Sequence, residues 1–561
     1  MRKVTPQALA KTPFQLPDVV TKVVPAPTGG WDAISPLAEM DPKRAPILIN
    51  WVPRPGWVEI RPGYDIWSVT NSGAPVETLL PYRPANGTEK LFAASDAHIY
   101  DVSTNSNATS VVTGSSSARY QYVMFSPAGN TNSYLQCVNG VDQLRQYDGT
   151  SWTQPSITGF PNGLTTANIF NIAAQKRRLW YVMGNGAGGR GTVAAFMPTD
   201  AITGPIAGYI DFAALWNKGG YLIAMADWTV DGGSGPQDYV GFLSSRGQVS
   251  LYAGTDPTNS AAWSLVGTFD LSIPISDRCV TRVGSDDAII TQAGVIPLSQ
   301  ALPFDPSADR SIAITARIQN AMVQAAISAA TNFGWQVIAY PAQTLAIINV
   351  PLTTNVNQVQ FVMNTITGAW CQFNGWNANH FEIYGDQLYF GGNDGNVYLA
   401  WQGSSDLITP INANMQLAYN YFDDPGRDKR ITMVQPVTVT NTVITVGLAV
   451  DVDFGISTVS APVSIGTPST TLWDTALWDS SIWDGSSTPT SVFKPWTSVQ
   501  AIGHALAIHL AVSITDPNVS VTATFDVGMF DSATFDSSHV NAPTVLQVDA
   551  FNAIMELGAF I

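Results

Sequence analysis

Short runs of alternating apolar and polar residues fill the chain between about residues 65 and 425, and they predict antiparallel strands. The clearest example joins QVQFVMNTITGAWCQFNGW to HFEIYGDQLYFGGNDGNVYLAW, with turn pairs at 367–368, 385–386 and 394–395. Thr-Gly, Gly-Asp and Asp-Gly pairs between β-branched and aromatic runs are typical of tight hairpins. This stretch therefore predicts consecutive hairpins.

Looser copies of this unit of strand, turn and aromatic strand recur upstream. They are KLFAASDAHIYDVS, SYLQCVNGVDQLRQYDGTSWTQ, RRLWYVMGNGAGGRGTVAAFMP, and DYVGFLSSRGQVSLYAGTD with the following AWSLVGTFDL. A four-stranded unit buries too little apolar surface alone, and radial packing of such repeats leaves only short edges. We count five or six units and expect an all-β fold built on a six-bladed β-propeller.

One segment near 311–331 follows a helical period instead of a strand period. In SIAITARIQNAMVQAAISAATNF, apolar side chains recur at Ile314, Ile318, Met322 and Ala325, and Ser311 can cap the start. We expect a helix inserted between blades.

Three regions differ in composition. Residues 1–64 are rich in proline, with six prolines between Pro36 and Pro62, so they predict an extended assembly arm that packs along a neighbouring molecule. Residues 65–425 form the predicted propeller, and residues 426–561 form an acidic C-terminal β domain. Deletion of residues 1–40 is expected to leave a folded propeller and to block assembly.

Charge narrows the set of partners. Charged residues make up only 12% of the chain and the net charge is −16. Residues 431–561 hold eleven acidic residues and a single basic one, Lys494. Because DNA binding requires Lys and Arg to neutralise phosphates, this region argues against gripping DNA and favours general solubility or a wall that does not adhere to it.

The sequence predicts no membrane span, no signal peptide and no disulfide framework. No stretch is long and apolar enough to predict a membrane span, and the first twenty residues lack the apolar core of a signal peptide. Cys137, Cys279 and Cys371 are odd in number and lie in apolar runs, so we interpret them as buried thiols.

Two C-terminal segments repeat an aromatic residue followed by aspartate at a period of five. The first holds Trp473, Trp478 and Trp483 before Asp474, Asp479 and Asp484, and the second holds Phe525, Phe530 and Phe535 before Asp526, Asp531 and Asp536. Neither a regular strand nor a helix aligns residues at this spacing, so the backbone must turn between copies. Aspartate-capped turns are favoured over a calcium site, because the D-x-D-x-D-G loop is missing.

Motifs for catalysis are weak. GNGAGG at 184–189 matches a dinucleotide-binding pattern, but RGTVAAFMP continues as a strand where a helix is needed, so we predict a hairpin loop. No phosphate-binding loop, H-E-x-x-H pair or G-x-S-x-G elbow occurs. His504 and His509 are five residues apart, which places them on opposite faces of a strand and argues against a shared metal. We therefore predict no catalytic, cofactor-binding or metal-binding residues.

Acidic pairs and one basic cluster leave alternatives open. Asp286-Asp287 and Asp423-Asp424 could supply the two acids of a propeller glycosidase, although adjacent acids usually mark turns. The segment YDGTSW at 147–152 only echoes the Asp-box of sialidases. Arg427, Lys429 and Arg430 favour a solvated connector or a salt bridge between subunits over a DNA site.

Taken together, three of these segments resemble a known family. GGWDAISPLAEMDPKRAPILINWVPRPGWVEIRPGY, the blade NTITGAWCQFNGWNANHFEIYGDQLYFGGNDGNVYLAW, and RDKRITMVQPVTVTNTVITVGLAVDVDF are similar to the tail nozzle proteins of podoviruses, also called tubular tail or phage stabilisation proteins. The resemblance covers most of the chain and its motifs are structural.

The resemblance implies a non-enzymatic virion protein of the tail, assembled in the host bacterial cytoplasm. It implies a homohexameric ring below the portal and adaptor proteins, near tail fibres or spikes, that retains the genome and lets double-stranded DNA pass without specific binding. The alternative is a receptor-binding or glycan-degrading tail protein.

Overall fold

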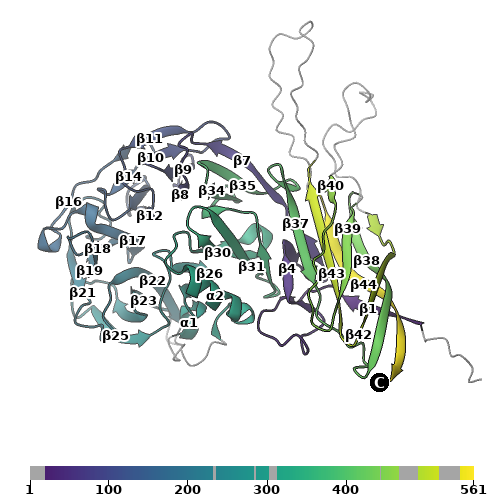
Figure 1. Cartoon of the computed structure of the whole chain (residues 1–561). Coiled ribbons are helices and arrows are strands. Elements are labelled where there is room, and N and C mark those ends of the chain that lie inside the picture. Colours follow the sequence, from purple (N-terminus) through teal and green to yellow (C-terminus); the bar gives the residue numbers. More distant parts are fainter. Residues whose placement is uncertain are drawn as a thin grey trace, which may run out of the picture.

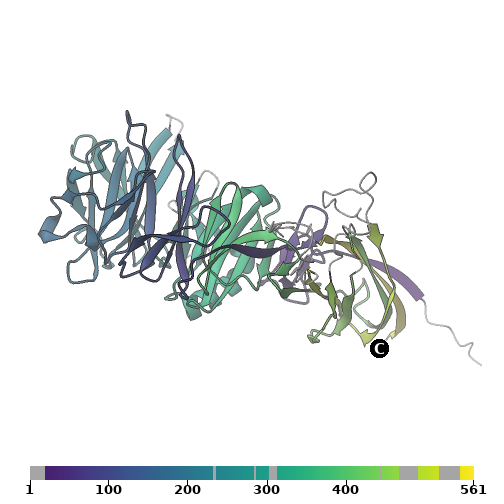
Figure 2. The ribbon, with the colours of Figure 1, turned by 90° about the horizontal axis from the view of Figure 1, so that it is seen from above.

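The chain folds into two bodies made almost wholly of strands. In the computed structural model of the 561-residue chain, the described residues are 19–231, 236–283, 286–301, 312–442, 444–465, 491–516 and 544–560. Figure 1 shows a ring of small sheets beside a sandwich, and Figure 2 shows the two bodies along the long dimension of the molecule. Within the described parts, no helix has the length and apolar character needed to cross a membrane.

Four antiparallel sheets of the ring follow one another along the chain. They contain β8 (Val76–Tyr82), β9 (Lys90–Ser95), β10 (His98–Asp101) and β11 (Thr109–Thr113); β12 (Gln121–Phe125), β13 (Tyr134–Val138), β14 (Arg145–Tyr147) and β15 (Trp152–Thr153); β17 (Ile169–Gln175), β18 (Arg178–Gly184), β19 (Arg190–Phe196) and β21 (Gly208–Asp211); and β22 (Leu222–Asp231), β23 (Pro236–Ser244), β24 (Gln248–Gly254) and β25 (Trp263–Asp270).

Three further groups of strands complete the ring. They contain β26 (Val280–Val283), β27 (Asp286–Thr291) and β28 (Gly294–Pro297); β29 (Gln336–Tyr340), β30 (Leu345–Thr353), β31 (Asn357–Asn364) and β32 (Trp370–Phe373); and β33 (Ala378–Tyr384), β34 (Gln387–Gly392), β35 (Asn396–Gln402) and β7 (Gly63–Val69). The outermost strand of the last group, β7, precedes the first group in sequence. It closes the ring by pairing antiparallel with β35.

The ring is a β-propeller, as predicted, and the described residues give it seven blades. From the second blade on, the innermost strand of each blade contacts that of the next; β8 of the first blade contacts β13 of the second, and β33 of the last blade packs on β8. The predicted number of six is not confirmed, because the blade β26–β28 was missed. Residues 280–297 contain no aromatic residue, whereas each of the units recognised in the sequence has an aromatic strand.

The predicted inserted helix is confirmed. The helix α2 (Gln319–Ala329) follows the fifth blade and packs on β30 of the sixth, after a short α1 (Leu298–Ala301). It begins after a 3-10 turn at Ala316–Ile318, and the proposed cap Ser311 lies outside the described residues. Other 3-10 turns are Pro161–Gly163, Thr166–Asn168 and Pro341–Gln343, and short pairs join β2 (Gly30–Trp31) to β3 (Arg44–Ala45) and β16 (Ile157–Thr158) to β20 (Gly204–Pro205).

The second body is a β-sandwich that combines both ends of the chain. One sheet contains β1 (Val19–Pro25), β5 (Trp51–Pro53), β6 (Val58–Ile60), β38 (Arg427–Thr440), β41 (Ser491–Phe493), β42 (Thr497–Gly503) and β44 (Leu546–Phe560). The other contains β4 (Ile47–Ile49), β37 (Thr409–Gln416), β39 (Val446–Val452), β40 (Val463–Ile465) and β43 (Leu506–Thr515), and β36 (Ser405–Asp406) links β37 to β7.

The N-terminal region differs from the extended arm that was expected. Its described part, 19–64, packs within its own chain: β1 pairs with β44 along seven residues, and β4 pairs with both β37 and β32. Trp51 from this region, Trp376 from the propeller and Phe551 from β44 belong to one buried apolar cluster. Strand-forming residues between the prolines found partners in the same molecule, so the two bodies share a core. Part of the stretch assigned to the propeller, residues 405–416, also joins the sandwich.

A buried arginine holds the junction between the bodies. Arg61, which is fully buried, makes a bidentate ion pair with Asp406 through Nη1–Oδ1 at 2.8 Å and Nη2–Oδ2 at 2.7 Å. Its Nε donates to Asn50 Oδ1 at 2.9 Å, its Nη2 donates to the carbonyl of Asn374, and its guanidinium lies 5.2 Å from the ring centroid of Trp376. The Arg61 guanidinium therefore has an ion-pair partner, hydrogen-bond acceptors and an aromatic ring around it.

Candidate functional site in the propeller axis

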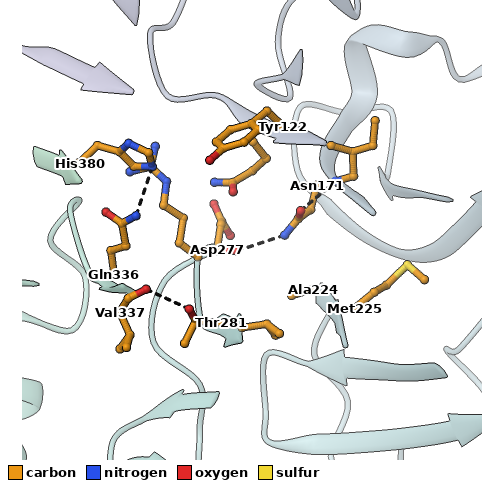
Figure 3. A pocket seen from close by; sticks show the side chains of 13 residues that line it. Tyr122, Asn171, Ala224, Met225, Asp277, Thr281, Gln336, Val337 and His380 are labelled. Atoms are coloured by element: carbon orange, nitrogen blue, oxygen red, sulfur yellow. Dashed lines mark hydrogen bonds between the residues drawn. The ribbon is translucent and has the colours of Figure 1, made fainter. Parts of the chain in front are cut away.

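The innermost strands of the propeller, with residues just before β26, line a polar cavity of about 250 Å³ near its axis. It is lined from six of the seven blades, by Gln121, Tyr122, Asn171, Ile172, Ala224, Met225, Asp277, Arg278, Val280, Thr281, Gln336, Val337 and His380. Figure 3 shows these side chains converging on one space. In a propeller the first strand of each blade faces the axis, which explains why residues so far apart in sequence meet here.

Arg278 is the principal charge in this cavity. It lies just before β26, and its Nη2 donates to Thr78 Oγ1 at 2.8 Å and to the carbonyls of Glu77 and Tyr120, each at 3.3 Å. The guanidinium also stacks 4.8 Å from the centroid of Phe333. Its Nη1 is buried and has no hydrogen-bond partner among the described residues. Burial lowers the pKa of Arg278 to about 10.

His380 lies beside this arginine on β33. Its Nδ1 accepts a hydrogen bond from the backbone N–H of Leu79 at 3.2 Å, and its Nε2 lies 3.5 Å from Gln336 Nε2. Burial lowers the pKa of the His380 imidazole well below its usual range, and the Arg278 charge lowers it further. The ring is therefore neutral, and its proton is on Nε2 because Nδ1 acts as an acceptor.

The opposite wall is fixed by side chains that bond to the protein itself. Asn171 Nδ2 donates to the carbonyls of Ile223 and Asp277, each at 3.1 Å. The Asp277 carboxylate pairs with Arg190 at 2.6 Å, and Arg190 stacks 4.0 Å above the ring of Phe170. The polar side chains of this wall therefore have partners within the protein.

A second cavity of about 700 Å³ adjoins the first and shares Tyr122, Thr281, Gln336 and Val337 with it. Glu382 lines this mouth, where Arg83 Nη2 donates to its Oε1 at 2.8 Å and the Tyr122 hydroxyl donates to its Oε2. Burial raises the pKa of Glu382, while Arg83 lowers it by a smaller amount. Both oxygens of this carboxylate are engaged, which leaves it poorly placed to act as an acid or a nucleophile.

The sequence did not single out any of these residues. Arg278 precedes the apolar strand β26 and Glu382 lies within β33. A charged residue in such a strand is the signal by which the sequence could have indicated the axis of the propeller. The pattern of one strand gives no information about which residues from other blades lie opposite. The converging set therefore required the tertiary structure.

The predicted hairpin loop at GNGAGG is confirmed. Residues 184–189 connect β18 to β19, and Asn185 Oδ1 accepts from the backbone N–H groups of Ala187 and Gly189, each at 3.0 Å. No helix begins there. The three cysteines are buried free thiols, as interpreted, and burial raises the pKa of each thiol.

The two histidines of the C-terminal region have different partners, but they do not lie on opposite faces of one strand as expected, because His504 is in the turn between β42 and β43. His509 is buried, with Nδ1 3.0 Å from Asp451 Oδ2 and Nε2 2.6 Å from Asn414 Oδ1. His504 is partly exposed and lies 3.3 Å from Asp428. Among the described residues, no group of three His, Cys, Asp or Glu side chains is placed to hold a metal ion.

The two acidic pairs make separate local contacts. Asp286 opens β27, where it accepts from Ser299, and Asp287 is buried beside it. Asp423 and Asp424 lie in the turn before β38, paired with Lys22 and Arg427. Neither pair lines the axial cavities.

The basic cluster pairs within the chain. Lys429 is buried, and its Nζ donates to the carbonyls of Arg427 and His504 at 2.8 and 2.9 Å, while Arg430 pairs with Glu556 at 3.5 Å. Burial lowers the pKa of Lys429. This cluster offers no open array of cations for phosphates. The aromatic–aspartate repeats from Trp473 to Asp484 and from Phe525 to Asp536 lie outside the described residues.

Comparison with known proteins identifies no family for this chain. No protein-family model and no curated protein matches the chain. Solved structures with some similarity include BBS1N crystallised with ARL6DN (11% identity, 62% of this chain, 97% of that chain, TM-score 0.36). Others are a 6-phosphogluconolactonase of Bacteroides uniformis (13%, 60%, 91%, 0.32) and Raptor of Chaetomium thermophilum (9%, 61%, 30%, 0.34). The strand pairing itself defines the class: an all-β protein of β-propeller fold.

Proposed function

We propose that this chain is a structural protein of a bacteriophage virion, the tail nozzle of a short-tailed phage, and that it works as a ring rather than as an enzyme. The resemblance of three sequence segments to podovirus nozzle proteins suggests the class. The propeller and the sandwich that shares its core supply a rigid body of the kind that such a ring requires. In this setting, the ring lies below the adaptor and portal proteins and double-stranded DNA passes through it.

The observation that carries the proposal is a pair of exposed valines on the edge strand of the sandwich. The register of β1 with β44, and of β44 with β38, places alternate residues of each strand on the side away from the core. On this side of β1, Val19 is 62% exposed and Val23 is 68% exposed. The neighbouring strands β44 and β38 carry polar residues there, including the pair Glu556–Arg430. We call Val19 and Val23 the outer valine face, and exposed apolar side chains at the open edge of a sheet favour an interaction site.

The open edge of the same sheet, strand β1, is also suited to an interface between subunits. In the described residues β1 pairs with β44 and with no strand on its other side. Its sequence VVTKVVP has β-branched residues at five of seven positions. Lys22, the one charged residue of this strand, pairs with Asp423, so its charge is not free to prevent pairing with another strand. An open, apolar edge strand presents unpaired backbone groups to which a strand of another chain can bind. A closed ring needs two different faces on each subunit, and this sheet would supply one of them.

Charge and site chemistry agree with a passive channel. The excess of acid in residues 431–561 repels phosphates, and the basic residues Arg427, Lys429 and Arg430 are engaged within the chain. The carboxylate of Glu382 at the axial mouth is already bonded through both oxygens. These features favour a structural role over the glycan-degrading alternative.

Oligomeric state tests the proposal. Electron microscopy of the purified full chain is expected to show sixfold rings, and light scattering the corresponding mass. The double variant Val19→Lys and Val23→Lys should shift the protein to monomers, because a buried lysine pair in the interface is costly. Ile366→Lys is the matched control, since Ile366 is 69% exposed on a propeller turn.

Two results would overturn the proposal. One is a wild-type protein that stays monomeric at the concentrations at which tails assemble. The other is a trimer that cleaves host polysaccharide, which would establish the receptor-binding or glycan-degrading tail protein instead. Loss of rings in the Ile366→Lys control as well would show that the outer valine face is not the interface.

A further inference from the structure

We propose that the axial cavity of the propeller is a binding site for a small oxyanion, such as inorganic phosphate or a short-chain carboxylate. The proposal is independent of ring formation. It follows from two hydrogen-bond donors, on residues that line one cavity, that have no acceptor partner among the described residues.

The first unmatched donor belongs to Arg278. Its Nη2 bonds to three neutral acceptors of the protein, whereas its Nη1 is buried with no partner among the described residues. No carboxylate in those residues lies within ion-pair distance of this guanidinium: Glu77 pairs with Arg119 and Asp277 with Arg190. A buried charge without a partner costs several kcal/mol by itself, so natural proteins pair it or bind a counter-ion there.

The second unmatched donor is His380 Nε2–H. The side chain is 2% exposed, and the bond from the Leu79 N–H to Nδ1 fixes the proton on Nε2. That nitrogen faces Gln336 Nε2 at 3.5 Å. Gln336 Nε2 donates to the Phe381 carbonyl and its Oε1 accepts from the Phe381 N–H, so its amide cannot turn to offer an acceptor. Two donors therefore face each other (Figure 3).

Several acceptors on the cavity walls are already engaged. Arg190 holds Oδ2 of the Asp277 carboxylate, the hydroxyl of Thr281 donates to the Val337 carbonyl at 2.9 Å, and the Asn171 Oδ1 accepts from the N–H of Ile172. Gln121 adds an amide, which can donate as well as accept, and Ala224 and Met225 add apolar surface. A guanidinium and an imidazole N–H without acceptors beside this space suit a ligand that accepts hydrogen bonds, which is an oxyanion.

Size and access define the ligand further. A volume of about 250 Å³ has room for a compact anion. The adjoining cavity of about 700 Å³ shares Tyr122 and Gln336 with it. Arg278 and His380 are both anchored on the segment Glu77–Leu79 of β8, so the two donors are held at a fixed separation before any ligand arrives.

Calorimetry and thermal unfolding of the full chain test this site with two probes, sodium phosphate and sodium succinate, at matched ionic strength in chloride. Wild type should bind at least one probe saturably at one site per chain, and the preferred probe identifies the ligand as phosphate-like or carboxylate-like. Arg278→Met should weaken binding about tenfold or more, as expected for loss of a charge-assisted bond. Arg119→Met is the matched control, because Arg119 stacks on the same Phe333, at 4.4 Å, and does not line the cavity.

A second variant keeps the test decisive if Arg278→Met does not fold. His380→Asn retains an acceptor for the Leu79 N–H and removes the Nε2–H, so it should weaken binding severalfold while the fold persists. Absence of saturable binding of both probes to wild type overturns the site. Equal weakening in Arg119→Met also overturns it, because the effect would then be nonspecific electrostatics.

Discussion

Two buried arginines of this molecule have opposite surroundings. Arg61, at the junction of the propeller and the sandwich, meets a bidentate carboxylate, a side-chain amide oxygen and two backbone carbonyls. Arg278, on the propeller axis, meets only neutral acceptors through one nitrogen and leaves another unpaired. A fully compensated charge stabilises a fixed arrangement, whereas a partly compensated charge is available to a ligand. The comparison separates a structural arginine from a functional one.

The largest expected effect is at the junction. Asp406→Ala leaves Arg61 buried without its ion-pair partner, and it should lower the free energy of unfolding by about 3–5 kcal/mol. Urea unfolding of the purified chain measures this. The double variant Arg61→Met with Asp406→Leu should lose clearly less, since no charge is stranded. An equal loss in both would mean that packing, not charge, holds the junction.

The next effect depends on pH and concerns the neighbour of Arg278. Because the pKa of His380 is depressed in the folded state, the unfolded chain takes up a proton below about pH 6.5 that the folded chain refuses. Stability is therefore lost as the pH falls below about 6.5, by up to about 1.4 kcal/mol per pH unit from this residue. Unfolding free energies of wild type and His380→Asn from pH 7.5 to 5 should diverge by that slope. Parallel curves would refute a neutral, buried imidazole.

Replacing Arg278 should cost less than breaking the Arg61 pair. Arg278→Met gives up three bonds to neutral acceptors but also removes a buried charge that has no ion-pair partner, so these effects oppose each other and the unfolding free energy in chloride buffer should fall by no more than about 1 kcal/mol. Addition of the bound oxyanion should then stabilise wild type and not the variant. A loss as large as that of Asp406→Ala would place Arg278 with the structural arginines.

The smallest effect is expected at an exposed pair. Arg430 and Glu556 lie 3.5 Å apart across β38 and β44, with side chains 42% and 28% exposed. Glu556→Gln should change the unfolding free energy by less than about 1 kcal/mol, and the difference should shrink in high salt. A larger, salt-independent loss would show that this pair is buried in the assembled protein.

Local pattern was sufficient for several features of this protein. Hairpin spacing and aromatic strands predicted the propeller, the helical period at residues 314–329 predicted α2, and the continuing strand after GNGAGG excluded a dinucleotide loop. These features depend on neighbours within a few residues. For the same reason, the blade β26–β28 without aromatic residues escaped notice, and the count of six became seven.

Contacts between distant segments were decided by the tertiary structure alone. The proline-rich region was expected to pack as an extended arm along a neighbouring molecule, yet β1 pairs with β44 of its own chain, some five hundred residues away. An edge strand with apolar residues gains stability by joining an existing sheet. Likewise Arg278 and His380 became neighbours only when seven blades closed around one axis. The sequence determined which strands and turns form; closure of the ring determined which polar groups are left facing each other across it.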